Sequence, residues 1–185
     1  MIHVTDEHVY IDTDTGKHYP SVTTILSDLG FYGKAPQYFT EESRQRGTFV
    51  HKLVNLHLND DLEEATLDPQ LKPYLSSWIK FESDSGLALI DSEVSFINDI
   101  YGFGGTYDLR AMINDELSLI DIKTGAVNKK ATGPQLAGYE ILIGKRCKRY
   151  ALHLTPDKAN LIPFTDRTDR NVFLSAVTCW KHINK

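Results

Sequence analysis

The sequence predicts an α/β fold in which a central mixed β-sheet is flanked by helices on both faces. Residues 87–124 hold three apolar segments separated by short turns, which is typical of consecutive antiparallel strands. Helix-like segments precede and follow them, and one falls between the later strands, where a crossover helix would lie. At 185 residues and 41% hydrophobic composition, the chain can form one domain with a sizeable core.

We expect a single domain spanning 1–185 without repeats or long linkers. It divides into a mostly helical N-terminal part, 1–86, a sheet core that carries the site, 87–165, and a C-terminal helix, 166–185. The predicted helices are 21–29, 35–58, 67–84, 133–144 and 167–183, and the predicted strands are 87–97, 103–113, 116–124, 149–155 and 159–165.

The N-terminal segment 8–19 reads as a small hairpin that turns at Asp-Thr-Gly, followed by a short helix with Ser21 at its start. Backbone N–H groups at such a helix start can hold a phosphate, so Ser21 and Thr24 are candidate DNA contacts. The alternative is an ordinary capped helix.

Residues 105–124 carry the strongest functional signal of the chain. If a two-residue turn at Asn114 and Asp115 joins the two strands, Asp108 lies directly across from Asp121. Lys123, two residues beyond Asp121, then shares the same face. The pattern therefore predicts a cluster of two carboxylates and one ammonium group.

Glu93 extends this cluster if the preceding connection is centred between Ile100 and Tyr101, because Glu93 then lies opposite Asp108. A bulge in either turn would move a carboxylate to the other face. Hard oxygen ligands on a rigid sheet suit Mg²⁺ or Mn²⁺, and a lysine beside them can position a water molecule or stabilise a phosphate. An Asp-x-Lys triplet alone is weak evidence, since surface strands often carry paired charges.

The order of five motifs resembles the RecB-like branch of the PD-(D/E)XK nuclease superfamily, over about residues 18–155. The matching motifs are His51, Glu93, Gly105-Thr106-Tyr107-Asp108, Asp121-Ile122-Lys123 and Gln135-x-x-x-Tyr139. The segments at 18–27 and 47–51 look like those of phage exonucleases and of the mitochondrial genome maintenance exonuclease. Tyr107 stands where the superfamily name has proline, and the second acidic position is Asp121.

The resemblance implies a restriction-endonuclease-like core and a catalytic group of Glu93, Asp108, Asp121, Lys123, Gln135 and Tyr139. It implies that Asp108, Asp121 and the carbonyl of Ile122 bind the metal, with His51 as a further ligand and Glu93 near the same centre. Gln135 would contact DNA or support the site, and Tyr139 would orient it. The residues alone leave simpler alternatives open: His51 as a structural or surface histidine on its helix and Tyr139 as an aromatic at the core edge.

Charge is distributed unevenly along the chain, whose net charge is −5. Residues 1–122 carry a net −13 and residues 123–185 a net +8. Lys129 and Lys130, after the Asp121 strand, are candidate DNA contacts, as are Arg44 and Arg46 about one turn before His51. The basic cluster at 145–149 is better explained as a helix C-terminal cap.

The sequence also limits the cofactors and the cellular location that we expect. Cys147 and Cys179 are too few for a disulfide framework or for a four-cysteine iron–sulfur cluster within one chain. The chain shows no cationic apolar leader and no membrane span. We therefore expect an intracellular, cytoplasmic protein, acting in the host cytoplasm if its origin is a phage.

The leading hypothesis is a Mg²⁺- or Mn²⁺-dependent DNA exonuclease that acts on single strands or free ends in recombination, replication or repair. A narrow groove favours a single strand over a duplex. The alternatives are a structure-specific endonuclease and a catalytically silent nucleic-acid-binding module. Polarity, DNA versus RNA preference, the number of metals and the oligomeric state do not follow from the sequence.

Overall fold

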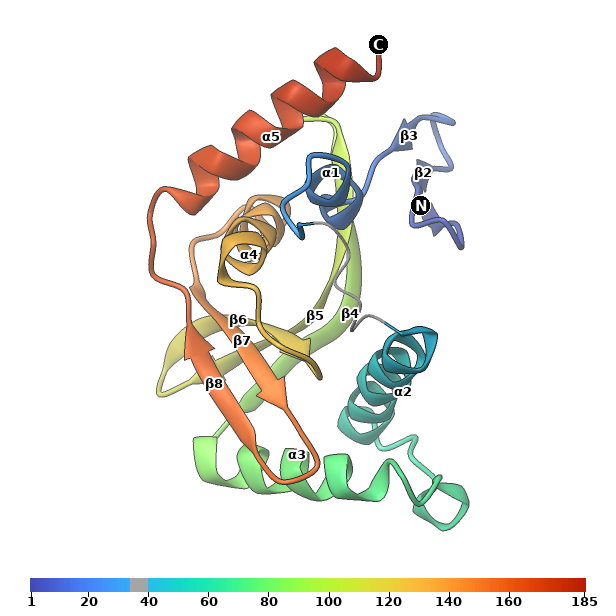
Figure 1. The fold of residues 1–185 in the computed structure, drawn as a ribbon, viewed down its shortest axis with the longest axis vertical. Coiled ribbons are helices and arrows are strands. Elements are labelled where there is room, and N and C mark those ends of the chain that lie inside the picture. The colour runs from blue at the N-terminus through green and yellow to red at the C-terminus, as the bar shows by residue number, and fades with distance from the viewer. Residues whose placement is uncertain (34–39) are drawn as a thin grey trace.

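The structure is a computed structural model and describes residues 1–33 and 40–185. Its centre is a five-stranded mixed sheet in the order β4-β5-β6-β7-β8 (Figure 1). The strands are β4 (Ala88–Asn98), β5 (Phe103–Ile113), β6 (Glu116–Lys123), β7 (Lys148–Leu154) and β8 (Ala159–Pro163). The predicted α/β class with a mixed sheet is confirmed.

Helices cover both faces of this sheet. They are α1 (Val22–Asp28), α2 (Glu41–Leu58), α3 (Lys72–Ser85), α4 (Lys129–Ile143) and α5 (Asp169–Ile183), with a short 3₁₀ turn at Glu64–Thr66. One core cluster joins α1, α4 and α5 to the sheet, and a second joins α2 and α3 to its other face (Figure 1). Among the described residues, no helix is both long and apolar enough to cross a membrane.

The connection from β6 through α4 to β7 determines where the site lies. β4, β5 and β6 form an antiparallel meander, whereas β6 and β7 are parallel and α4 crosses between them. The C-terminal end of β6 and the first half of α4 therefore lie at the same edge of the sheet. Asp121 and Lys123 come from the former, and Gln135 comes from the latter.

The register of the β5–β6 hairpin follows its turn. Asn114 and Asp115 both have positive φ, 50° and 61°, as a type I′ turn requires. Pairing is symmetric about this turn, from Ile113 and Glu116 outward. The last pair is Leu109 with Ile120, so the strands separate before the predicted pairing of Asp108 with Asp121 is reached.

The β4–β5 register also agrees with the sequence prediction. Val94 pairs with Tyr107 and Ser92 with Leu109, which places Glu93 opposite Asp108. Glu93 itself has a φ of 52°, in the left-handed region that residues other than glycine seldom adopt. The register shift in this pair of strands lies between Leu89 and Asp91, away from the carboxylates.

Three predicted boundaries were wrong. α4 begins at Lys129 rather than 133, because Asn128 caps it through Lys130 and Ala131, and Pro134 lies inside the helix. α3 begins at Lys72 rather than 67, with a proline in its first turn, where the missing N–H does no harm. The helix predicted at 35–58 begins, in its described part, at Glu41, and residues 35–39 lie outside the described residues.

The N-terminal hairpin belongs to a three-stranded sheet of β1 (Ile2–Val4), β2 (Tyr10–Asp12) and β3 (His18–Tyr19). The sequence did not predict β1. This small sheet lies beside β4 and β5, and a single bridge between Ser21 and Gly104 continues the contact to the start of α1. β1 thus adds a third strand to the predicted N-terminal hairpin.

Candidate active site

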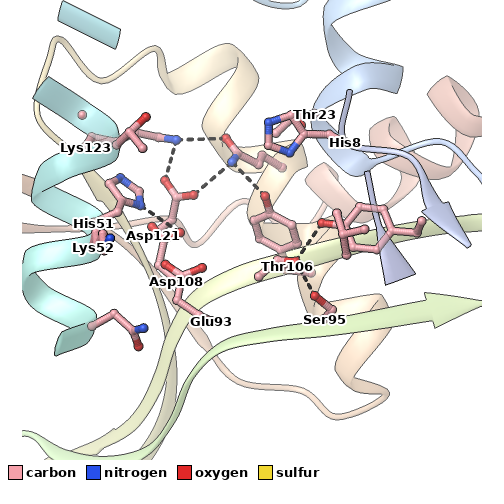
Figure 2. A pocket seen from close by; sticks show the side chains of 17 residues that line it. His8, Thr23, His51, Lys52, Glu93, Ser95, Thr106, Asp108, Asp121 and Lys123 are labelled. Atoms are coloured by element: carbon pink, nitrogen blue, oxygen red, sulfur yellow. Dashed lines mark hydrogen bonds and ion pairs between the residues drawn. The ribbon is translucent and has the colours of Figure 1, made fainter. Parts of the chain in front are cut away.

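A cavity of about 650 Å³ opens where β5 and β6 separate (Figure 2). Side chains from α2, β4, β5, β6, α4 and the N-terminal sheet line it. It contains the predicted site residues His51, Glu93, Asp108, Asp121, Lys123, Gln135 and Tyr139. Residues more than 80 positions apart in the sequence thus meet in one hollow.

Asp108 lies at the point where the two strands part. Its Oδ2 accepts a hydrogen bond of 2.5 Å from the backbone N–H of Ile122, and its Oδ1 lies 3.3 Å from Nδ1 of His51. Burial raises the pKa of Asp108, but the His51 imidazolium, Lys123 and the Ile122 N–H together hold it below the usual range. Asp108 is therefore ionised and is bound on both of its oxygens.

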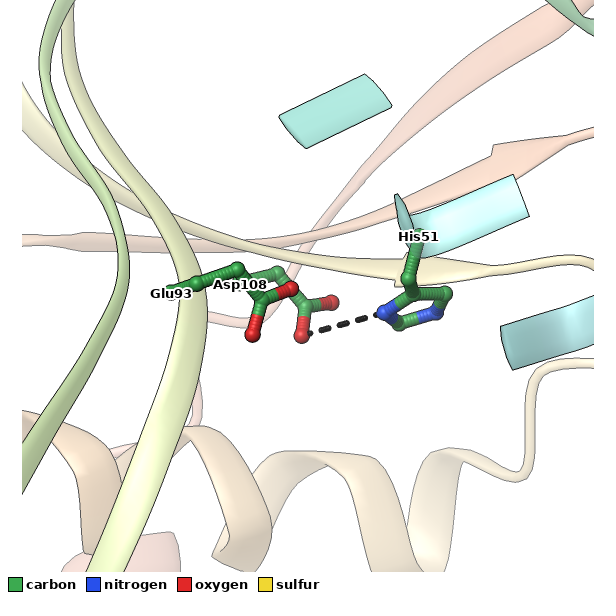
Figure 3. Close-up of side chains that lie close together, drawn as sticks. All are labelled: His51, Glu93 and Asp108. Carbon is green, nitrogen blue, oxygen red and sulfur yellow. Dashed lines mark ion pairs between the residues drawn. The ribbon is translucent and has the colours of Figure 1, made fainter. Parts of the chain in front are cut away.

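His51, Glu93 and Asp108 form a possible metal-binding group. One ligand atom from each lies within 4.8 Å of the others, and Figure 3 shows the three side chains directed toward one another. Burial, and then the charge of Asp108, raises the pKa of Glu93 to about 7. Burial lowers the pKa of His51, but Asp108 outweighs this and raises it to about 9. Protons bound within this group therefore offset the negative charge of its carboxylates, and a divalent cation can replace such protons.

Buried Asp121 forms an ion pair with half-buried Lys123 next to this group. Asp121 is 2% exposed, and its Oδ2 lies 2.7 Å from Nζ of Lys123. Burial raises the pKa of Asp121 above its ordinary value, against the effect of the ammonium. Burial also lowers the pKa of Lys123, but Asp121 and Asp108 raise it further, so Lys123 is cationic.

Gln135 connects the ion pair to α4. Its Nε2 donates to Oδ1 of Asp121 at 3.0 Å and to the hydroxyl of Tyr139 at 3.2 Å, and its Oε1 accepts from Lys123 at 3.3 Å. Gln135 is 3% and Tyr139 6% exposed. Burial raises the pKa of Tyr139 well above its ordinary value, so its hydroxyl keeps its proton. Both side chains thus hold the orientation of Asp121 and Lys123.

The two further predicted metal ligands, Asp121 and the Ile122 carbonyl, are not part of the group of three. Lys123 and Gln135 already engage the Asp121 carboxylate, and the Ile122 N–H is used by Asp108. Whether the Asp121 carboxylate and the Ile122 carbonyl complete the metal shell stays a prediction. Asp121 lines the same cavity as the group of three, whereas Ile122 is not among the described residues that line it.

The two predicted DNA contacts at the start of α1, Ser21 and Thr24, have different environments. Ser21 is 3% exposed, and its hydroxyl accepts from the Thr24 N–H at 2.8 Å, which is the capped helix that the sequence left as the alternative. Thr24 lines a neighbouring cavity of about 380 Å³ together with Tyr32, Lys123 and Gln135. Because this hydroxyl is buried and already bonded, the geometry gives no support to a direct contact of Ser21 with DNA, which stays a prediction.

The predicted basic contacts lie outside the cavity. Arg44, Arg46, Lys129 and Lys130 are all exposed, and none of them is among the described residues that line it. Arg44 lies 3.9 Å from Glu41 on its own helix. Their contact with a nucleic acid stays a prediction.

Sequence reasoning missed several cavity-lining residues. Thr48, Lys52 and Asn55 lie on the same face of α2 as His51, and the spacing of three and four residues on a helix would have found two of them. Ser95 and Thr106 are paired across β4 and β5, two residues from Glu93 and Asp108, so strand alternation would have found both.

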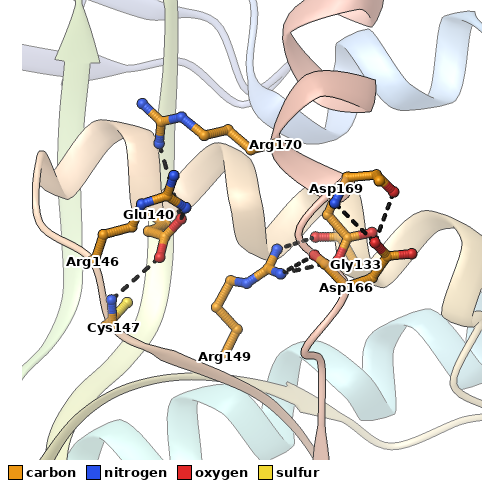
Figure 4. Close-up of polar contacts among 9 residues, drawn as sticks. Gly133, Glu140, Arg146, Cys147, Arg149, Asp166, Asp169 and Arg170 are labelled. Carbon is orange, nitrogen blue, oxygen red and sulfur yellow. Dashed lines mark hydrogen bonds and ion pairs between the residues drawn. The ribbon is translucent and has the colours of Figure 1, made fainter.

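The basic cluster at 145–149 is not a simple helix cap (Figure 4). Arg146 lies 3.0 Å from the buried carboxylate of Glu140. Arg149 lies in β7 and is 9% exposed; it donates to the carbonyls of Gly133 and Asp166 and lies 3.1 Å from Asp169. The expected capping role was therefore wrong for Arg149, which connects β7 to α4 and α5.

Comparisons with known proteins show a shared fold. The chain superposes on a crystal structure from Eubacterium rectale described as "Putative exonuclease", with a TM-score of 0.59 and 14% identity over 87% of this chain and 77% of that one. An alkaline exonuclease from Laribacter hongkongensis, LHK-Exo, matches with a TM-score of 0.38 and 17% identity over 90% and 91% of the two chains. No protein-family model and no curated protein sequence matches the chain. The first of these likenesses shows that the chain has the fold of the Eubacterium rectale protein.

Proposed function

We propose that this protein is a metal-dependent nuclease of the PD-(D/E)XK type that hydrolyses phosphodiester bonds in DNA. The observation that carries the proposal is one cavity holding a group of His51, Glu93 and Asp108 beside the Asp121–Lys123 ion pair. The fold shared with a structure described as "Putative exonuclease" supports it. The two independent lines, local chemistry and fold, point to the same reaction class.

The residues present fit a divalent cation. His51, Glu93 and Asp108 offer one nitrogen and two carboxylates, which suits Mn²⁺ and, less well, Mg²⁺, for which oxygen ligands are the rule. When bound, such an ion supplies Lewis-acid activation of a phosphate and of a water molecule. Asp121 and the Ile122 carbonyl would be its further ligands.

The remaining residues position and stabilise the reacting groups. Lys123 is cationic and points into the cavity, so it can donate to a phosphate oxygen as negative charge develops on it. Gln135 fixes Lys123 and Asp121 through hydrogen bonds to both. Asp108 accepts the Ile122 N–H beyond the last backbone pair, so a side chain links β5 to β6 at the cavity floor.

We further propose that the substrate is a single strand or a free DNA end and that the enzyme acts as an exonuclease. The cavity of about 650 Å³ falls within the size range of pockets for small ligands, about 300–1,000 Å³. α2 on one side and the N-terminal sheet on the other limit its width. A duplex would have to separate its strands before one of them enters. Roles in recombination, replication or repair would follow from this activity.

The test is degradation of linear and circular single-stranded DNA of equal sequence, each with Mg²⁺ or Mn²⁺. We expect the wild type to degrade only the linear strand, and the Lys123→Met variant to degrade neither. Cleavage of the circle would replace the exonuclease with the endonuclease alternative. If the wild type leaves both substrates intact yet binds them, the protein is a nucleic-acid-binding module, and the nuclease proposal fails.

A direct measurement of metal binding tests the group of three without reference to activity. We expect His51→Ala to weaken Mn²⁺ binding by about tenfold or more, because it removes the nitrogen ligand and the partner of Asp108. Titration calorimetry of the two proteins measures this. His57→Ala, a histidine on the same helix that lies 2.9 Å from Glu82, is the matched control and should bind Mn²⁺ as the wild type does. Equal affinity in all three proteins would remove His51 from the metal site.

A further inference from the structure

The N-terminal three-stranded sheet forms the wall of the cavity that faces α2. Val4 of β1, Tyr10 of β2 and His8 of the turn between them line the cavity, opposite Thr48, Lys52 and Asn55 of α2. None of these three residues of the wall belongs to the motifs named above or to the metal group. A side chain that this wall directs into the cavity would meet whatever occupies it.

Close packing fixes this wall on the central sheet. A Cβ atom built on Gly104 would lie 2.5 Å from the Tyr10 ring, so the ring packs directly on the β5 backbone. The Tyr10 hydroxyl is 2.8 Å from Oγ1 of Thr106, which in turn is 2.7 Å from Oγ of Ser95. Tyr10 is 3% exposed. The wall is thus anchored beside the strand positions of Glu93 and Asp108.

A second anchor holds the far end of the same sheet. Asp99, in the turn between β4 and β5, accepts a hydrogen bond of 2.7 Å from the Tyr19 hydroxyl and one of 3.0 Å from Lys17. Lys17 and Asp99 are both largely exposed, so this ion pair adds modestly to stability. Together with Tyr10 it attaches the small sheet to β4 and β5 at two separate places.

His8 projects from this wall in an uncommon backbone conformation. Its φ is 58°, in the left-handed region, and its turn is closed by Thr5, which pairs with Val9 and accepts the His8 N–H at 3.0 Å. Residues other than glycine in this region carry strain and tend to cluster at functional sites. Figure 2 shows the His8 ring beside Thr23, on the side of the cavity opposite α2.

We propose that His8 is a substrate-binding residue that donates a hydrogen bond to a backbone phosphate of the bound strand. This rests on the proposed function. The scissile phosphate would lie at the metal group and Lys123, so His8, across the cavity, would meet a neighbouring phosphate. Asp6 and Glu7 occur in the same turn but are not among the described residues that line the cavity. Their negative charge opposes a long-range attraction of the strand, so the contact is a short-range hydrogen bond.

The experiment measures DNA binding apart from cleavage. A labelled single-stranded oligonucleotide is titrated with Lys123→Met protein, in which cleavage is suppressed, and with the same protein carrying His8→Ala, His8→Asn or His3→Ala. We expect His8→Ala to raise Kd about tenfold, because it removes a hydrogen bond to a charged group. His8→Asn should restore most of the affinity, since asparagine keeps a donor and tolerates a positive φ. His3, exposed on β1, is the matched control and should have no effect.

Kinetics and folding complete the test. In the active protein, His8→Ala should raise KM about tenfold while kcat and Mn²⁺ affinity stay close to wild type, because His8 lies outside the metal group. Thermal unfolding checks that the turn still folds, and His8→Asn serves if His8→Ala does not fold. An unchanged Kd and KM in His8→Ala overturns the inference alone. Binding that depends on His8 without cleavage by the wild type overturns the nuclease proposal alone. No binding of the strand by any of the proteins overturns both.

Discussion

Lys123→Met is expected to reduce the rate of DNA cleavage by about 100- to 10,000-fold, the range found when a positioned proton donor or charge-stabilising group is removed. Lys123 is the cationic side chain that lies 2.7 Å from Asp121 beside the candidate metal group. Methionine keeps most of its length but carries no charge and donates no hydrogen bond. Single-turnover cleavage of a linear strand measures the effect on the chemical step.

Lys123→Met should affect metal binding differently from the rate of cleavage. Lys123 is not one of the three ligands, and removing its positive charge leaves the carboxylates more attractive to a cation. We therefore expect Lys123→Met to bind Mn²⁺ at least as tightly as the wild type. A loss of rate together with a loss of metal affinity would mean that the substitution had disturbed the whole cluster.

Lys52→Met is the comparison that separates chemistry from binding. Lys52 lines the same cavity from α2 but is exposed, and it follows His51 directly in the sequence. We expect its loss to raise KM by less than about tenfold and to leave most of kcat, as for a screened phosphate contact. If Lys52→Met lowered kcat as much as Lys123→Met, the special role of Lys123 would be wrong.

The parts of the site that the sequence predicted depend on local rules. The turn at Asn114 and Asp115 determines the β5–β6 register, and the helical spacing of Gln135 and Tyr139 places both on one face of α4. The β4–β5 turn likewise determines that Glu93 lies opposite Asp108. Each of these depends on residues close in the chain, so the sequence pattern is sufficient.

The parts that it did not predict depend on contacts between distant segments. Tyr10 packs on Gly104, 94 positions away, and no local pattern indicates that a hairpin will dock there. The β5–β6 ladder ends at Leu109 and Ile120, and beyond it the Asp108 carboxylate accepts the Ile122 N–H, a contact that a simple ladder would not predict. The start of α4 was misplaced because Pro134 was interpreted as a start signal, whereas the Asn128 cap lies six residues earlier.

The net charge of a sequence segment does not show how much positive surface it exposes, as the basic C-terminal part illustrates. Several of its cations balance nearby carboxylates instead of facing a nucleic acid: Arg146 and Glu140, Lys148 and Glu116. A net charge of +8 over residues 123–185 therefore overstates the positive surface available to phosphates. Which cations are free depends on tertiary pairing, which the sequence alone does not contain.

Arg149→Met is expected to lower the free energy of unfolding by about 3–5 kcal/mol, the cost of leaving a buried charge without its partner. Arg149 is 9% and Asp169 13% exposed at the side chain, and their ion pair joins β7 to the start of α5. The guanidinium also donates to the carbonyls of Gly133 and Asp166. Urea unfolding measures the loss. Arg167→Met, an exposed arginine nearby, should change stability by no more than about 0.5 kcal/mol.

The loss in the free energy of unfolding caused by Arg149→Met should become smaller as the pH falls. Burial already raises the pKa of Asp169 above its ordinary value while Arg149 opposes the shift, so without Arg149 the pKa rises further. An acid whose pKa is higher in the folded state than in the unfolded state destabilises the fold when ionised, and this cost disappears as the carboxyl is protonated. The difference from wild type should therefore be smaller at pH 5 than at pH 7.5. A difference that is constant or grows on acidification would show that the destabilisation comes from the lost carbonyl contacts and not from the unpaired carboxylate. Asp169→Asn in the Arg149→Met background would then restore no stability.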